Sequence, residues 1–186
     1  MTPEVRQPIL EPGVTCWRTA VARRFVLLPD GESYMPAMRA AMEAARHSIL
    51  LVGWDFDPRI PLNPAAGDEA PDRLCDLFSR LLVRRPALRI QILIWDMSRL
   101  FTWQRRERPQ NAAQWLPSPV QYRLDARHPL GAAHHQKLLV VDDAVAFCGG
   151  ADFTRNRWDT RAHLSNDPRR RAPGGGFYPP TKKAGW

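Results

Sequence analysis

Two side chains that could act on a phosphate group lie two positions apart, at His135 and Lys137. They begin an apolar segment, residues 135–141, whose composition predicts a β-strand. Successive side chains of a strand alternate between its two faces, so His135 and Lys137 would point one way and Gln136 the other. The spacing therefore predicts that an imidazole and an ammonium group share one small volume.

An imidazole beside an ammonium group suits phosphodiester transfer. An imidazole, whose unperturbed pKa is about 6.5, is a competent nucleophile near neutral pH and can form a covalent intermediate that is resolved later. A fixed ammonium group can stabilise the negative charge that accumulates on the phosphoryl oxygens, and it needs no metal to do so. The leaving alcohol must still be protonated, a task that normally calls for a second histidine across the phosphorus.

The residues around this pair resemble the signature of the phospholipase D superfamily, which is His-x-Lys, four residues, Asp, and then a pair of small residues. Here these positions are His135, Lys137, Asp142, Gly149 and Gly150. The resemblance covers about residues 25–171, where further segments are similar to the first half of bacterial two-motif members, such as phospholipase D and cardiolipin synthase-like proteins. Those segments are residues 53–57, Trp95-Asp96, His128-Pro129 and residues 157–160.

The resemblance implies an active site in which two such motifs meet. One histidine would form a phosphohistidine and the other would act as the acid, with no metal and no cofactor. By this match His135 and Lys137 are the catalytic residues that bind the substrate phosphate. Asp142 is expected to be a catalytic residue with a supporting role at the end of the motif.

Further site residues follow from the same resemblance. Gly149, Gly150 and Asp152 are expected to support the site, but many members have Asn where this chain has Asp152. A carboxylate cannot donate the hydrogen bond that an amide gives to a phosphate oxygen, so the role of Asp152 stays open. Trp54 and Asp55 are candidate residues of the pocket mouth. The remaining histidines are interpreted as structural or exposed: His47, His128, His134 and His163.

The sequence contains one His-x-Lys pair, so a complete site needs a second one from elsewhere. A two-fold dimer could place the same histidine on both sides of the phosphorus. Alternatively, the chain is the truncated first half of a two-motif enzyme, which is the interpretation we favour. The expected function is hydrolysis or transphosphatidylation of phospholipids. The alternatives are a single-motif homodimeric nuclease, for which nucleic acid is the partner, and a catalytically silent phosphate-binding fragment.

The surrounding pattern predicts an α/β fold, a phospholipase D-like sandwich with a central mixed sheet flanked by helices and forming one repeat half. Helices are expected over residues 33–46 and from about residue 71, where apolar side chains recur at helical spacing. Six segments are expected to form strands. They are residues 25–28, 48–54, 88–95, 120–124, 135–141 and 144–148, with 48–54 buried on both faces and 88–95 largely buried.

Composition divides the chain into an N-terminal extension (residues 1–24), the catalytic half (25–166) and a basic, Gly- and Pro-rich disordered tail (167–186). The net charge of +8 suits an anionic partner but does not identify it. Three widely spaced cysteines suggest neither a disulfide framework nor a zinc site. The sequence shows no signal peptide or transmembrane run, so we expect a cytoplasmic chain, with phospholipid as substrate and peripheral contact with a membrane.

Overall fold

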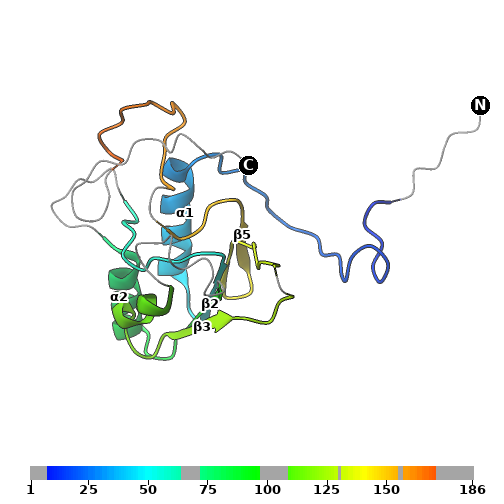
Figure 1. Ribbon diagram of the computed structural model, residues 1–186, viewed down its shortest axis with the longest axis horizontal. Helices are drawn as coiled ribbons and strands as arrows, with labels where there is room; N and C mark the ends of the chain where they lie inside the picture. Colours follow the sequence, from blue (N-terminus) through cyan, green and yellow to red (C-terminus); the bar gives the residue numbers. More distant parts are fainter. Residues whose placement is uncertain (1–7, 64–71, 97–108, 130, 155–156, 171–186) are drawn as a thin grey trace, which may run out of the picture.

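The computed structural model describes residues 8–63, 72–96, 109–129, 131–154 and 157–170 (Figure 1). Within them a five-stranded mixed sheet has the order β3-β2-β1-β4-β5. The elements are α1 (Gly31–Ala44), β1 (Ser48–Gly53), α2 (Leu74–Arg84), β2 (Arg89–Trp95), the 3-10 helix η3 (Pro109–Trp115), β3 (Gln121–Asp125), β4 (Leu138–Val141) and β5 (Val145–Cys148). The predicted α/β class with a central mixed sheet is confirmed.

The order of the strands follows from how they are connected. Strands β1, β2 and β3 are parallel to one another, and α2 lies in the connection between β1 and β2. Strands β4 and β5 form an antiparallel hairpin, and β4 also pairs antiparallel with β1. The hairpin turn at Asp142 and Asp143 has φ of 53° at both positions, the left-handed conformation that tight hairpin turns require.

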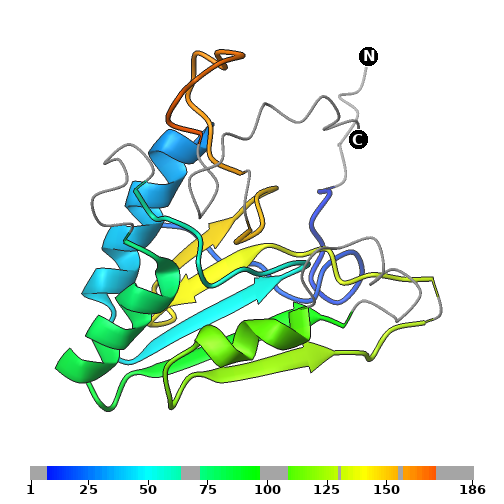
Figure 2. The same cartoon turned by 60° about the vertical axis from the view of Figure 1, so that its left-hand side comes forward.

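Both helices pack on the same face of the sheet, as Figure 2 shows. Side chains of α1 such as Met38 and of α2 such as Leu77 join Ile49 and Leu51 of β1 in one buried cluster. Leu50, which points to the other face of β1, is 38% exposed. The prediction that residues 48–54 are buried on both faces was therefore wrong, because a short apolar run does not reveal whether a second layer covers it.

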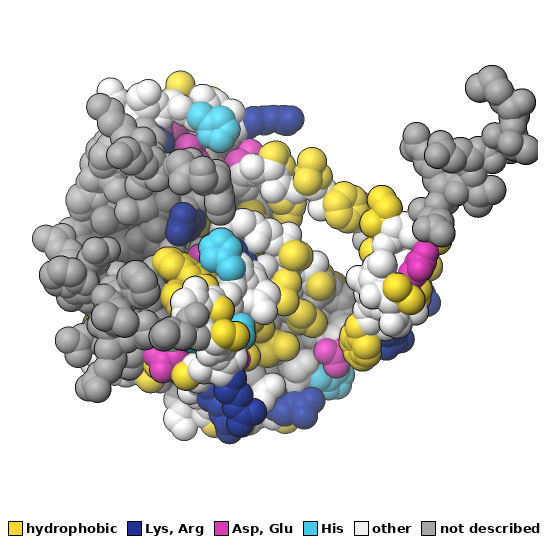
Figure 3. Space-filling model, turned by 45° about the vertical axis from the view of Figure 1, so that its right-hand side comes forward, with side chains coloured by type: hydrophobic (Ala, Val, Ile, Leu, Met, Phe, Trp, Pro, Cys, Tyr) yellow, Lys and Arg dark blue, Asp and Glu magenta, His cyan; other side chains and the backbone are white. Residues whose placement is uncertain are grey.

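Residues 8–30 form an arm that contains no helix or strand. Phe25 is 85% exposed and Leu27 is 77% exposed, so the predicted strand at residues 25–28 is not formed. Figure 3 shows hydrophobic side chains along this arm, which stands out from the rest of the molecule. At the end of the arm Asp30 caps α1, because its carboxylate accepts a hydrogen bond from the backbone N–H of Ser33 at 2.7 Å.

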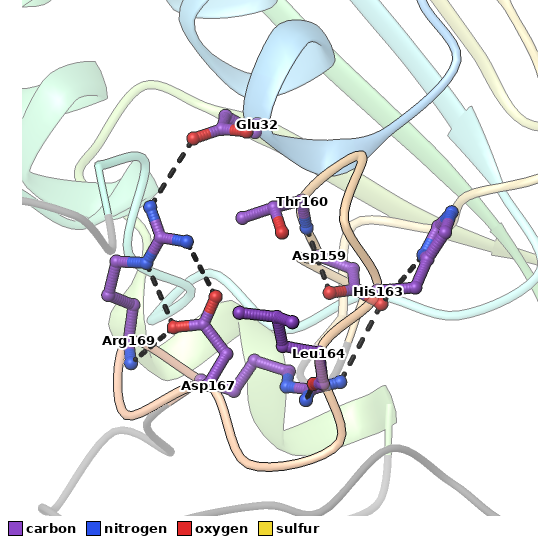
Figure 4. A network of polar contacts seen from close by, with 8 residues as sticks. Glu32, Asp159, Thr160, His163, Leu164, Asp167 and Arg169 are labelled. Atoms are coloured by element: carbon purple, nitrogen blue, oxygen red, sulfur yellow. Dashed lines mark hydrogen bonds and ion pairs between the residues drawn. The ribbon is translucent and has the colours of Figure 1, made fainter.

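The segment after β5 returns to the start of α1. The backbone N–H of Glu32 donates to the carbonyl of Asp159 at 2.9 Å, and Trp158 is buried beside Gly31. Figure 4 shows how Arg169 extends this contact by pairing with Asp167 and with Glu32. The hydrogen bond from Arg169 lowers the pKa of Asp167 to about 2.

The described structure continues beyond residue 166, where composition predicted the start of a disordered tail. Asp167 and Arg170 are 1% and 2% exposed, and Arg170 donates to the carbonyl of Leu164 and pairs with Asp159. Residues 167–170, assigned above to the tail, therefore pack onto the domain. Residues 171–186 and most of the basic stretch at residues 98–110 lie outside the described part. No helix among the described residues is long and apolar enough to cross a bilayer.

Replacing Gly31 by Ala should destabilise the fold. A Cβ at Gly31 would lie 2.7 Å from the Cα of Trp158 and 3.0 Å from the carbonyl oxygen of Arg157, so backbone must move. We expect a loss of about 1–3 kcal/mol in the free energy of unfolding, measured by urea denaturation. Gly149→Ala is the matched control, since nothing lies within 4 Å of a Cβ there. Equal effects of the two changes would contradict the close packing at Gly31.

Candidate active site

His135 and Lys137 lie just before β4, at the edge of the sheet where β1 and β2 end. Because β4 runs antiparallel to β1, its first residue, Leu138, pairs with Val52 near the end of β1. The predicted strand was thus three residues too long at its start. The position agrees with the general rule that ligands of α/β sheets bind beyond the carboxyl ends of the parallel strands.

The indole of Trp54 contacts both candidate catalytic side chains. Its ring centroid lies 5.9 Å from that of His135, edge to face, and 5.9 Å from Nζ of Lys137. Its other neighbour is Trp95 at the end of β2, stacked at 5.7 Å. One aromatic ring therefore holds the imidazole and the ammonium group near each other, although His135 itself does not belong to a strand.

The two side chains differ in exposure. His135 is exposed, whereas Lys137 is 6% exposed. Nζ of Lys137 lies 3.2 Å from Oδ2 of Asp152 and donates a hydrogen bond to the carbonyl of His135 at 3.1 Å. The imidazole is thus accessible to an incoming group. The ammonium group is buried and is held by its contacts with Asp152 and with the carbonyl of His135.

Asp152 is the most buried acidic group of the site, with its side chain 1% exposed. Its Oδ1 accepts hydrogen bonds from the backbone N–H groups of Trp54 at 2.9 Å and Asp55 at 3.2 Å. A Cβ on Gly53 would come within 3.4 Å of Oδ1, so the absence of a side chain there leaves room for the carboxylate. Asp152 therefore accepts hydrogen bonds from the backbone, and this role does not need the amide donor that an asparagine would have.

Asp142 lies at the opposite end of β4 and does not join the other motif residues. Its carboxylate accepts hydrogen bonds from the backbone N–H groups of Arg46, His47 and Ser48 at 2.7–2.8 Å. The strand β4 lies between Asp142 and Lys137, which are five positions and about 17 Å of extended chain apart. The carboxylate of Asp142 therefore fixes the start of β1.

The other predicted site residues take secondary places. Gly149 and Gly150 are exposed with nothing crowding them, and the N–H of Gly149 donates to the carbonyl of Lys137 at 3.3 Å. Asp55 is partly buried, and its carboxylate accepts from the N–H of Phe56 at 2.9 Å. Gly149 therefore contributes a backbone hydrogen bond to Lys137, and neither glycine is required by the close approach of a side chain.

Two histidines that sequence reasoning set aside lie beside this group. His128 contacts Trp95 with ring centroids 5.7 Å apart, and His134 lies 5.7 Å from His128. Nε2 of His134 is 3.5 Å from Oδ2 of Asp125, which orients its ring. In the sequence, the segments Trp95-Asp96 and His128-Pro129, which come at strand ends, were the signal that could have indicated these two histidines. Among the described residues, no three His, Cys, Asp or Glu side chains form a potential metal site.

The pKa values of two tyrosines near the site are raised, first by burial and then by nearby carboxylates. Burial, followed by the charges of Asp152 and Cys148, raises the pKa of Tyr34 to about 12. Burial, followed by the charges of Asp55 and Asp96, raises the pKa of Tyr122 well above its ordinary value. Neither tyrosine was singled out from the sequence, since nothing in the local pattern places them near the motif.

Sequence comparison with known proteins finds relatives named phospholipase D. Over 141 residues the chain is 28% identical to phospholipase D A of Dictyostelium discoideum, covering 74% of this chain and 11% of that protein. It is 26% identical to human phospholipase D1 over 152 residues, covering 80% of this chain and 14% of that protein. No protein-family model matches.

Solved structures with a similar arrangement include Nuc from Salmonella typhimurium, described as a phospholipase D family member. It has a TM-score of 0.46 and 20% identity, covering 68% of this chain and 69% of Nuc. A phosphatidylserine synthase from Haemophilus influenzae has a TM-score of 0.47 and 18% identity, covering 70% and 28% of the two chains.

The sequence matches confirm the resemblance to the phospholipase D superfamily, and this chain is a relative of its phosphodiester-transferring members. The chain spans about a tenth of the length of the curated relatives that it matches.

Removing the ammonium group alone should destabilise the chain. Lys137→Met leaves the buried carboxylate of Asp152 without its counter-charge, and we expect a loss of about 3–5 kcal/mol in urea denaturation. Adding Asp152→Asn should restore most of it, because the amide oxygen still accepts from Trp54 and Asp55 without a charge. A stable Lys137→Met chain would show that the pair is not buried.

The hydrogen bonds to Asp142 should give a distinct acid dependence. They lower its pKa from 3.8 to about 2, the donation by Ser48 having the largest effect. The folded chain holds this proton more weakly than the unfolded chain, so the stabilisation is present above pH 4 and is lost as the pH falls toward 2. Urea denaturation should therefore show Asp142→Asn less stable than wild type at pH 7, with a difference that shrinks in acid. The exposed Asp143→Asn should show no such change.

Proposed function

We propose that the chain supplies one catalytic half of a phosphodiester-transferring enzyme that acts on phospholipids, with His135 as nucleophile and Lys137 as the fixed cation. The observation that carries this proposal is the contact of both side chains with the indole of Trp54. An accessible imidazole beside a buried ammonium group matches what attack on a phosphate needs. The names of the relatives, phospholipases D, support phospholipid as the substrate class.

The proposed chemistry has two steps. A ring nitrogen of His135 attacks the phosphorus, the bond from phosphorus to the leaving oxygen breaks, and the leaving oxygen takes a proton from a general acid. Lys137 stabilises the charge on the phosphoryl oxygens throughout. Water or another alcohol then gives its proton back to that acid–base group and attacks the phosphorus, and the phosphorus–nitrogen bond breaks to release the imidazole. The first acceptor gives hydrolysis and the second gives transphosphatidylation.

The general acid has to come from a second motif. The described residues hold one His-x-Lys pair, and His134 beside it is oriented by Asp125 and the carbonyl of Arg127. We place the chain as the first half of a two-motif enzyme, in keeping with the small share of its relatives that it spans. A phospholipid substrate also implies peripheral contact with a membrane surface. The competing arrangement is a homodimer in which a second copy supplies the acid.

An activated diester can test the half-site without its acid. The nitrophenolate released from bis(4-nitrophenyl) phosphate leaves without protonation, so His135 should be phosphorylated even when the second motif is missing. We expect a burst of one nitrophenolate per chain, followed by slow turnover, in a stopped-flow absorbance measurement. His135→Ala should abolish the burst, and the double variant Lys137→Met with Asp152→Asn, whose stability should be largely restored, should slow it by about a hundredfold or more.

Controls separate this outcome from unspecific hydrolysis. His47→Ala removes an exposed imidazole at the other end of β1 and should leave the burst unchanged. A burst that survives in His135→Ala would refute the proposed nucleophile. A burst followed by rapid turnover, together with a dimeric mass in solution, would favour the homodimer over the missing half.

A further inference from the structure

The ammonium group expected to receive the phosphate is already paired in the free chain. Nζ of Lys137 lies 3.2 Å from Oδ2 of Asp152, with the two side chains 5% and 1% exposed. The pair has a formal charge of zero. A phosphate that enters therefore meets one cation and, directly behind it, one fixed anion.

Asp152 cannot swing away when a phosphate arrives. Its other oxygen accepts the N–H groups of Trp54 and Asp55, which form the turn that ends β1. Moving the carboxylate would leave those two donors unpaired in the interior, a cost of about the same size as a lost hydrogen bond for each. The negative charge thus remains in place during binding.

Among the described residues, further acidic side chains lie at the ends of β1, β2 and β3. Asp55 and Asp96 both raise the pKa of Tyr122, after the effect of burial, so their carboxylates lie near the same strand ends. His134 is oriented toward Asp125.

We propose that Asp152 makes this half-site selective for singly charged phosphodiesters over doubly charged phosphomonoesters. The inference rests on the proposed function, because it assumes that the phosphate binds beside Lys137. A diester carries one negative charge, which the ammonium group balances. The second charge of a monoester has no counter-charge within the Lys137–Asp152 pair and is repelled by Asp152 at short range. An asparagine at this position would remove that repulsion.

This selectivity would affect both the binding of the substrate and the release of the product. Hydrolysis of a phosphodiester produces a phosphomonoester, whose second ionisation has a pKa of about 6. Near neutral pH the product therefore gains a charge that the substrate lacked. A fixed carboxylate behind the cation would favour entry of the diester and release of the monoester.

Dimethyl phosphate and methyl phosphate test this directly, since they differ by one methyl group and, at pH 8, by one charge. Each is titrated into the whole chain while NMR follows the indole N–H signals, among which Trp54 contacts both His135 and Lys137. The wild-type chain should bind dimethyl phosphate about tenfold more tightly than methyl phosphate. Asp152→Asn should reverse that preference, raising the affinity for methyl phosphate by about tenfold or more.

The matched control is Asp143→Asn, which makes the same change at an exposed hairpin position and should keep the wild-type preference. A wild-type chain that prefers methyl phosphate at pH 8 overturns the inference, and this measurement stands even if Asp152→Asn fails to fold. A preference that Asp152→Asn leaves unchanged overturns it as well. If neither ligand binds, or if binding survives in Lys137→Met, the proposed function fails together with the inference.

Discussion

The buried ion pair between Lys137 and Asp152 is the contact on which the candidate site depends. It joins the segment before β4 to the segment after β5, and Asp152 also holds the turn that ends β1. Removing charges from water is costly unless they are paired and hydrogen-bonded, and here both oxygens of the carboxylate have partners. The pair therefore fixes the geometry of three segments more than it adds to stability.

Strand β4 is held at both ends by acidic side chains of one motif. Asp152 fixes its beginning through Lys137, and Asp142 fixes its end by accepting three backbone N–H groups before β1. A slip of one residue would turn every side chain of β4 to the other face. The acidic residues of the motif thus fix the register of β4, and among its ionisable side chains His135 is the exposed one.

Much of this arrangement could be predicted because it rests on local patterns. Helical spacing predicted α1 and α2, and the apolar runs predicted β1 to β5 to within a few residues. The place of Asp142 could have been predicted too, since five positions of extended chain separate it from Lys137. The partner of Lys137 could not, because only the fold brings Asp152 to it. The sequence did not reveal that the second face of the sheet is open. Alternation of side chains along a strand shows which residues point toward the core, but it does not show what covers the opposite face.

The neutral pair also explains how the candidate site can be assembled before any ligand binds. An uncompensated ammonium group buried to this degree would favour other conformations until an anion arrived, whereas the carboxylate lets Lys137 stay in place before binding. Pre-organised charge is what makes electrostatic catalysis effective, because nothing has to reorient as the reaction proceeds. The same carboxylate limits how much negative charge the site tolerates. Pre-organisation and selectivity for charge are therefore two results of one contact.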